Sequence, residues 1–317
     1  MPEPTRRMLV VHADDLGLTT SFNRGIREAH QGGFLTSTSI RTNGAAFDEA
    51  VAEVLPECPE LGVGVHLNVV EGRSELPAGA RSPRVCDAHG GFRASFSSLM
   101  KAYLARDKAT FDEVRAHYRS QIEMVLARGV RIDHLNSHQH SHAVPGVFSV
   151  VCELAAEYDI PFVRLPRERF SLGEGLAFHL GAWFPINVAK HLVLNTLAFR
   201  NDSIAKRAGI RTNDLFVGIL YTGHVTEGTL RNGLRVLSSV RSTVAEILVH
   251  PCKTIDGEAE EYVAPYLDAY VHDPARAVEL AAILATDMRR FIEYEGWALV
   301  SYRQLGRTLG LPLRGSQ

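Results

Sequence analysis

The feature that most constrains this chain is a regular alternation between short β-branched or apolar runs and longer stretches with helical periodicity. About eight runs have the composition of buried parallel strands, at 8–11, 36–42, 61–70, 131–137, 162–165, 215–220, 243–249 and 298–301. Helices or long loops separate them. This alternation predicts an α/β fold, and the strand count favours an irregular (β/α) barrel of mostly parallel strands. An open, doubly wound sheet is the alternative.

The helical stretches repeat apolar residues at three- and four-residue spacing. The clearest, 110–128, runs from Phe111 to Val125 on one face and ends at Gly129. Further helices are expected after Ser21, which can cap one, and over 145–158 and 274–294. We expect 1–317 to form a single barrel domain with one insertion, at about 167–211, between the fifth and sixth strands.

This insertion is long for a connection and unusually apolar. Apolar residues from Val188 to Phe199 spread around a helix, and a basic cluster from Arg200 to Arg211 follows. An apolar helix beside basic residues is typical of a peripheral membrane contact. We favour a helix packed on the core or in a homodimer interface, because large exposed apolar patches are rare. The alternative is a lid that admits a lipid-linked substrate.

Composition excludes several classes of protein. The formal net charge of -2 predicts no nucleic-acid partner. No apolar run is long enough to span a membrane, and 8–11 is too short for a signal peptide. The cysteines form no CxxC pair, so we expect reduced thiols and a cytoplasmic protein, with any contact at the inner face of the cytoplasmic membrane being peripheral. The cysteines are Cys58, Cys86, Cys152 and Cys252.

Polar side chains recur at the carboxyl ends of the expected strands, where parallel α/β folds place ligands and catalytic groups. In chain order they are Asp14, Asp15, Asn43, His66, Asn68, Asn136, His138, Arg164, Thr222, His224 and His250, with His140 and His142 just beyond the fourth strand. Six or seven such ends on one face predict a functional site. Taken alone, the three histidines from His138 could be a solvated loop, and Asn43 and Asn68 could satisfy buried backbone groups.

One aspartate and two histidines from different strands could bind a metal ion. Imidazole and carboxylate suit Zn²⁺, Fe²⁺, Ni²⁺ or Co²⁺ better than an all-oxygen Mg²⁺ site, and three protein ligands leave a position for water. Successive side chains on a strand point in opposite directions, so one of Asp14 and Asp15 should bind the metal and the other should act as a base or orient a ligand. The same donors also suit a mononuclear iron oxygenase.

Four segments resemble a known family, the YdjC-like carbohydrate deacetylases. The segment VHADDLG at 11–17 is similar to their N-A-D-D-F-G opening, and GVHLN at 64–68 matches G-x-H-L-N. HLNSHQHSH at 134–142 is similar to H-x-D-S-H-x-H-x-H, and EILVHP at 246–251 matches E-x-x-x-H-P. The resemblance extends from about Arg7 to Ser301.

The resemblance implies an irregular barrel and a divalent metal ion held by Asp15, His66 and His138. It implies Asp14 as general base and His250 as the acid near the leaving amine. We expect zinc, with Mg, Ni, Co or Fe as alternatives. We expect further residues to bind substrate or orient the ligands: Asn43, Asn68, Asn136, Arg164 and His140.

The resemblance also implies an N-acetylated glycolipid or oligosaccharide substrate. The segment 216–225 and the apolar stretch after Arg167 look most like the hopanoid biosynthesis-associated branch, whose substrate would be N-acetylglucosaminyl bacteriohopanetetrol. The alternatives are a chito-oligosaccharide deacetylase and a non-catalytic sugar- or lipid-binding protein. Two residues depart from the family pattern: His12 replaces the usual Asn, and Asn136 replaces the usual Asp, which puts the metal affinity in question.

Overall fold

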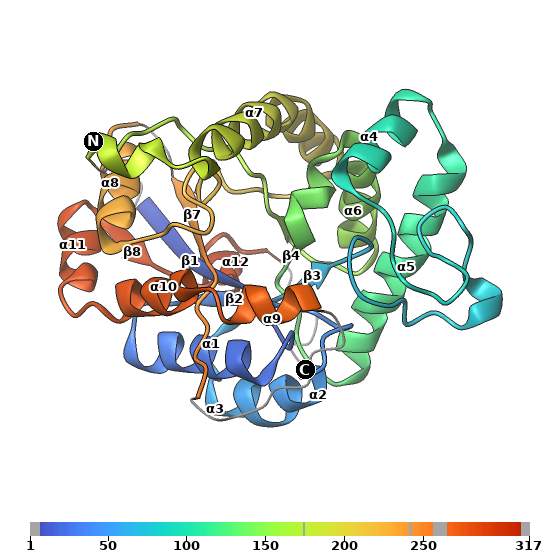
Figure 1. Ribbon diagram of the computed structural model, residues 1–317, viewed down its shortest axis with the longest axis horizontal. Coiled ribbons are helices and arrows are strands. Elements are labelled where there is room, and N and C mark those ends of the chain that lie inside the picture. Colours follow the sequence, from blue (N-terminus) through green and yellow to red (C-terminus); the bar gives the residue numbers. More distant parts are fainter. Residues whose placement is uncertain (1–6, 174, 241–242, 256–264, 312–317) are drawn as a thin grey trace.

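The computed structural model describes residues 7–173, 175–240, 243–255 and 265–311 (Figure 1). The strands are β1 (Arg7–Leu16), β2 (Ser37–Ile40), β3 (Gly62–Leu67), β4 (His134–Ser137), β5 (Phe162–Val163), β6 (Leu215–Val217), β7 (Val244–Val249) and β8 (Trp297–Leu299). All pairings between these strands are parallel. Their order in the sheet is β5-β4-β3-β2-β1-β7-β6, and β8 pairs with β1.

Apart from β8, the strands follow one another around the barrel in chain order, and the ring of strands is interrupted between β5 and β6. At that point two isolated parallel bridges, Phe162 to Arg211 and Glu168 to Phe216, connect the two ends of the sheet. The predicted irregular barrel is therefore confirmed, and the doubly wound alternative is wrong. Strands β3 and β7 are buried at every position, because the helices cover one face and the barrel interior covers the other.

The helices are α1 (Thr20–Gly32), α2 (Phe47–Glu49), α3 (Leu55–Glu57), α4 (Phe96–Leu104), α5 (Lys108–Ala127), α6 (Pro145–Glu157), α7 (Trp183–Ala208), α8 (Glu227–Ser238), α9 (Pro265–Val271), α10 (Pro274–Leu284), α11 (Met288–Tyr294) and α12 (Tyr302–Thr308). Two expectations were wrong. Thr19, and not Ser21, accepts the capping hydrogen bond of α1. The single helix expected over 274–294 is two helices, because the backbone at Ala285 is extended.

Strand β1 continues past the end that its composition suggested. It reaches Leu16, so the acidic pair lies within the strand. Its register against β2 shifts between Ala13 and Leu16, and Asp15 has a φ of 70°. A non-glycine residue with positive φ is uncommon and often marks a functional position. This irregularity changes the direction of the second carboxylate relative to a regular strand.

Helix α7 forms most of the insertion, which does lie between β5 and β6 as predicted. Its buried face carries Leu194, Ala198 and Ala205 together with polar residues. Large apolar side chains point the other way, and Leu192 and Phe199 are 61% and 72% exposed. The expectation that core packing would cover this helix is therefore correct for one side only. Within the described residues, none of the helices combines the length and the hydrophobicity of a membrane span.

Candidate active site

Three side chains from three segments meet at the carboxyl end of the barrel. Asp15 comes from the irregular part of β1, His66 from β3, and His138 directly follows β4. Asp15 Oδ1 lies 3.5 Å from His66 Nε2 and 3.7 Å from His138 Nδ1, and the two nitrogens are 3.4 Å apart. The structure thus brings together the three residues that the sequence predicted as metal ligands.

These three atoms fit a metal ion. Ligand atoms about 2.0–2.2 Å from a tetrahedral zinc are about 3.3–3.6 Å apart, close to the spacing here. Asp15 Oδ1 is buried and accepts no hydrogen bond from the described residues, which is costly unless another group binds it. Burial lowers the pKa of His66 to about 4, so its ring is neutral and Nε2 can offer a lone pair.

Other groups hold the two imidazoles in orientation. His66 Nδ1 lies 2.9 Å from Asn136 Oδ1, which leaves Nε2 directed at Asp15. His138 Nε2 lies 2.9 Å from Glu71 Oε2, and Arg41 Nη2 donates to the same oxygen at 3.0 Å. Outer carboxylates of this kind fix the ring of a ligating histidine. No sequence motif pointed to Glu71 or Arg41, although Glu71 lies only three residues beyond Asn68.

Asp14 lies beside the three atoms and forms a two-point ion pair with Arg164. Arg164 Nη1 and Nη2 each donate to one Asp14 oxygen at 2.9 Å. Burial alone would raise the pKa of Asp14, but Arg164 and then His66 hold it well below 3.8. Both neighbouring aspartates reach His66, Asp14 at Nδ1 and Asp15 at Nε2, because the irregular backbone at Asp15 turns both carboxylates towards one site. The expected opposite directions of the two side chains are therefore wrong, whereas only Asp15 joins the group of possible metal ligands.

The amide at position 136 suits this site. Asn136 Nδ2 donates to Asp14 Oδ1 at 2.9 Å, while its Oδ1 faces His66 Nδ1. A carboxylate in the same place would face Asp14 at hydrogen-bond distance and repel it. The departure from the family pattern at Asn136 therefore preserves the orientation of His66 and removes a like charge.

The strand β7 side of the site contains His250 and two residues that the sequence analysis missed. The backbone N–H of His250 donates to Glu279 Oε2 at 2.5 Å, and His250 Nδ1 lies 3.7 Å from the same oxygen. Tyr270, from α9, donates its hydroxyl to Asp15 Oδ2 at 3.1 Å. Burial and then Asp15 raise the pKa of Tyr270 well above 10, so its hydroxyl remains a donor.

The remaining predicted residues differ in their placement. Asn43 and Asn68 bond to each other and both donate to the Glu71 carbonyl, so they hold the turn that carries Glu71. His140 has a positive φ of 51°, packs its ring edge-on at 5.6 Å from Phe216, and has a buried Nδ1 without a partner. Its nitrogen is thus free for another group, whereas Asn43 and Asn68 act on Glu71.

The chain matches a known protein family. The family model described as YdjC-like protein matches residues 8–294, which is most of the chain. The chain belongs to the YdjC-like protein family. This span includes all of the candidate site residues named above.

Several relatives of this YdjC-like chain are named carbohydrate deacetylases. One from Brevibacillus brevis is 27% identical over 94% of this chain and 99% of its own length. Another, from Mus musculus, is 31% identical over 78% of each chain. A solved structure from Enterococcus faecalis, of a protein proposed to cleave cellobiose phosphate, superposes with a TM-score of 0.68 at 23% identity, covering 95% of this chain and 99% of the other. That likeness supports the barrel fold.

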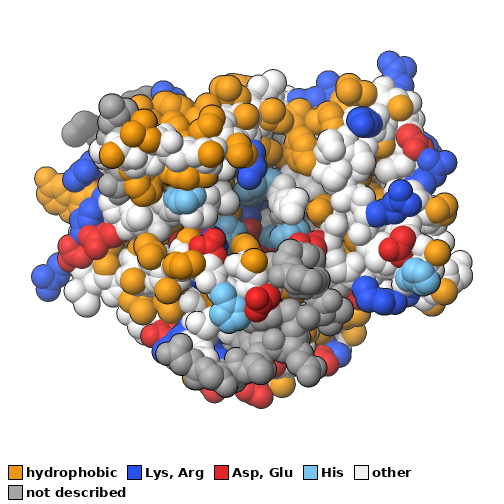
Figure 2. All heavy atoms as spheres, viewed as in Figure 1, with side chains coloured by type: hydrophobic (Ala, Val, Ile, Leu, Met, Phe, Trp, Pro, Cys, Tyr) orange, Lys and Arg blue, Asp and Glu red, His pale blue; other side chains and the backbone are white. Residues whose placement is uncertain are grey.

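The site opens on one face of the YdjC-like barrel. Figure 2 shows a hollow in the middle of the drawn face, where histidine, acidic and basic side chains meet. Hydrophobic side chains cover the surface directly above it, where Figure 1 draws α7, and α9 lies below. The exposed apolar side of α7 therefore adjoins the mouth of the hollow.

A second buried group has the residue types of a metal site but a different hydrogen-bond pattern. Cys86, Glu113 and His117 lie close together. His117 Nδ1 pairs with Ser74, its Nε2 lies 3.5 Å from Cys86 Sγ, and both Glu113 oxygens accept from Ser82. Because these partners satisfy the group, unlike Asp15 Oδ1, we interpret it as a clamp that fixes the 73–92 loop to α5.

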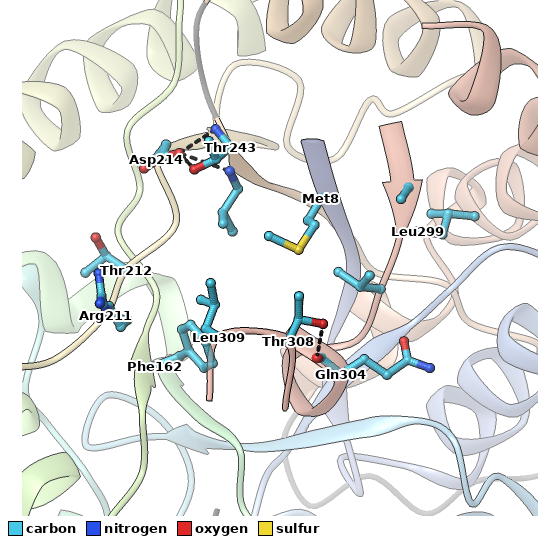
Figure 3. Close-up of a pocket in the computed structure, with 13 residues that line it drawn as sticks. Met8, Phe162, Arg211, Thr212, Asp214, Thr243, Leu299, Gln304, Thr308 and Leu309 are labelled. Atoms are coloured by element: carbon cyan, nitrogen blue, oxygen red, sulfur yellow. Dashed lines mark hydrogen bonds between the residues drawn. The ribbon is translucent and has the colours of Figure 1, made fainter. Parts of the chain in front are cut away.

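A cavity of about 600 Å³ lies at the other end of the barrel (Figure 3). Met8, Phe162 and Val244 line it, and these residues lie at or near the amino ends of their strands. Asp15, His66 and His138 are at the carboxyl ends. The cavity is therefore separate from the candidate site, and its lining is largely apolar.

Proposed function

We propose that this YdjC-like protein is a metal-dependent carbohydrate deacetylase that hydrolyses the N-acetyl group of an N-acetylated sugar. The observation that carries the proposal is the buried Asp15 Oδ1, which has no hydrogen-bond partner among the described residues and faces His66 Nε2 and His138 Nδ1. Relatives named carbohydrate deacetylases that match nearly the whole chain support the reaction and the substrate class.

Asp15, His66 and His138 would hold the metal ion, which we propose to be zinc. When bound there, such an ion would lower the pKa of water and polarise the acetamide carbonyl. Asp14 accepts the proton of the attacking water. Arg164 keeps Asp14 ionised and fixed in direction, so the carboxylate is a weak base that is always available for the proton.

His250 donates a proton to the departing amine. Its backbone is fixed by Glu279, whose carboxylate also lies 3.7 Å from Nδ1. Tyr270 keeps the second oxygen of Asp15 occupied, so that Oδ1 alone faces the histidines. His140 Nδ1, which has no hydrogen-bond partner among the described residues, would bind a polar group of the substrate.

The exposed side of α7 supports a more specific substrate, an N-acetylated sugar linked to an apolar group. Ile186, Leu192 and Phe199 on α7, and Leu180 just before it, are all more than half exposed. A patch of this kind on a soluble domain usually marks an interface, and this one adjoins the hollow (Figure 2). We propose that the lipid part of an N-acetylglucosaminyl lipid, such as N-acetylglucosaminyl bacteriohopanetetrol, lies along α7 while the sugar enters the hollow.

The reaction is tested by acetate release from an N-acetylglucosaminyl lipid and from chito-oligosaccharides, with metal content measured on the same samples. Wild type should release acetate and contain a divalent ion, and His66→Ala and His138→Ala should lose both. Asp14→Asn should keep the metal and lose turnover. Binding without acetate release would instead favour a sugar- or lipid-binding protein, and an oxygen requirement with bound iron would favour an oxygenase.

The substrate class is tested by Leu192→Ser, Val193→Ser and Phe199→Ser combined, which alter exposed positions and should leave the fold intact. KM for the lipid-linked sugar should rise, and KM for a soluble N-acetylglucosaminide should not change. Leu104→Ser, at an exposed position on α4, is the matched control. An unchanged KM for the lipid-linked sugar would leave chito-oligosaccharides as the better substrate. If α7 forms a homodimer interface instead, the triple variant would change the oligomeric state in sedimentation experiments.

A further inference from the structure

A line of buried hydrogen-bonding side chains continues from Asp14 into the barrel, away from the proposed metal site. Arg164 Nη2 lies 2.8 Å from His12 Nδ1, and His12 Nε2 lies 2.7 Å from His134 Nε2. His134 Nδ1 then lies 2.6 Å from Asp133 Oδ1. Every one of these side chains is fully or almost fully buried, and the proposed reaction uses only Asp14 and Arg164.

The two ends of this line constrain the direction of its hydrogen bonds when each imidazole carries one proton. A guanidinium group only donates, so His12 Nδ1 must accept from Arg164, and the proton of a neutral His12 is on Nε2. Burial and then Arg164 keep the pKa of His12 well below 6.5, so the ring is neutral. His12 Nε2–H therefore donates to His134 Nε2.

The far end of the line requires the same placement of protons on the two rings. Asp133 Oδ2 accepts from the Val63 backbone at 3.0 Å, and Oδ1 faces His134 Nδ1. A carboxylate accepts at both oxygens, so His134 must carry its proton on Nδ1 and accept on Nε2. With one proton on each ring, only one arrangement satisfies both Arg164 and Asp133.

This order matters at Arg164 because its Nη2 is crowded. Nη2 lies within 3 Å of Asp14 Oδ1, Glu246 Oε1 and His12 Nδ1. If His12 presented an N–H there, it would face an Nη2 donor at 2.8 Å and compete with Arg164 for Asp14 Oδ1, which lies 3.2 Å from His12 Nδ1. The pairing of Arg164 with Asp14 would then be disturbed. Arg164 holds both oxygens of Asp14, so the direction of Asp14 would change. A shift of this kind in a catalytic group can lower a rate by about 100-fold.

A barrel core gains little stability from such a line. Buried polar networks are costly unless every member is satisfied, and apolar side chains of similar volume are often as stable. We propose that His12, His134 and Asp133 are positioning residues for the hydrolysis: through the proton order of the two imidazoles they fix Arg164 and thereby the direction of Asp14. This inference rests on the proposed function of Asp14 as the base. It also gives a role to His12, where the family usually has Asn.

The test is Asp133→Asn, which keeps the shape of the side chain and replaces one hydrogen-bond acceptor with a donor. To keep the bond from the Val63 N–H, the amide must turn its oxygen towards Val63, so its NH₂ faces His134 Nδ1. His134 must then carry its proton on Nε2. That N–H either faces the Nε2–H of His12 or, if His12 changes tautomer, leaves His12 with an Nδ1–H that faces Arg164. We expect kcat for deacetylation to fall about 10- to 100-fold, with KM and metal content unchanged.

Asp214→Asn is the matched control. Asp214 also accepts backbone and hydroxyl hydrogen bonds near the amino end of the barrel, from Thr243 and Val244, and the bonds described for it involve no histidine. It should keep wild-type kcat. His12→Asn, whose amide oxygen can still accept from Arg164, should retain more activity than His12→Leu, which has no acceptor. A purely structural role would predict that kcat follows the melting temperature in all four variants.

A second readout does not depend on activity. ¹⁵N NMR of the metal-loaded protein with labelled histidines should show an unprotonated Nδ1 on His12 and an unprotonated Nε2 on His134, and Asp133→Asn should change this pattern. A wild-type His12 protonated at Nδ1, or a wild-type kcat in Asp133→Asn, would overturn the inference. A wild-type protein that releases no acetate refutes the proposed function, and the catalytic role inferred here falls with it; the spectra then report on the proton order alone.

Discussion

The carboxylate of Glu71 offers a sharp test of the proposed metal site, because no sequence motif pointed to it. Glu71 Oε2 contacts two groups beside the proposed metal position. They are His138 Nε2 at 2.9 Å, which belongs to a candidate ligand, and Arg41 Nη2 at 3.0 Å. Arg41 Nη1 lies 3.6 Å from Asp15 Oδ1. Glu71→Gln therefore weakens the hold on His138 and leaves the positive charge of Arg41 uncompensated beside the metal position.

Both effects should lower metal affinity. Losing an outer partner of a ligating histidine typically weakens metal binding by about 10- to 100-fold, which corresponds to about 1.4–2.7 kcal/mol. The uncompensated Arg41 charge acts in the same direction, so we expect the upper part of this range. The side chain keeps its size, so packing should not change.

The assay is competition for Zn²⁺ between the protein and a chromophoric chelator, with kcat measured at saturating metal. Glu75→Gln is the matched control: Glu75 lies in the same loop and accepts from Thr42 at 2.6 Å, but the bonds described for it reach neither histidine of the site. Glu71→Gln should bind Zn²⁺ at least about 10-fold more weakly than Glu75→Gln. Equal affinities in the two variants and the wild type would refute the orienting role of Glu71.

Three further predictions follow from single side chains. Burial lowers the pKa of His117 from 6.5 to about 4, so between these pH values the unfolded chain binds a proton that the folded chain does not. The contribution of His117 to the free energy of unfolding is therefore complete above about pH 6.5 and falls by up to about 3 kcal/mol towards pH 4. In urea unfolding without metal, this pH-dependent loss should be absent from His117→Leu. Tyr270→Phe should keep its metal but lower kcat about 10-fold, because Asp15 Oδ2 loses its donor; metal loss equal to that of His66→Ala would contradict this. His250→Ala should slow an alkyl acetamide far more than an activated acetate ester, whose leaving group needs no proton, and equal losses on the two substrates would indicate a binding role instead.

The comparison of sequence with structure is most informative at the acidic pair. The sequence located both aspartates at the end of a buried strand, and it placed His66 and His138 at the ends of two neighbouring strands. Because parallel strands in a barrel share one carboxyl face, strand order alone was enough to bring these groups together. It was not enough to direct their side chains, since the positive φ of Asp15 breaks the alternation of the strand.

The insertion shows a second limit. Its apolar composition predicted a buried helix, but α7 buries polar residues such as Asn187 and Asn201 and exposes Leu192 and Phe199. Asn187 donates to the carbonyls of Leu220 and Thr222, and Asn201 to that of Ala143. The helix is thus attached by hydrogen bonds to loop backbone, and hydrophobic periodicity contains no information about such partners.

The sequence by itself determined the alternation of strands and helices, the face on which the site forms, and the residue types that meet there. These follow from local periodicity and from the common direction of parallel strands, both of which are properties of short segments. Only the tertiary structure brought Glu71 into contact with His138 and Tyr270 into contact with Asp15. It also joined His134 through His12 to Arg164. Each of these contacts joins residues that are between 67 and 255 positions apart in the sequence. A hydrogen bond across such a separation is fixed by the path of the folded chain.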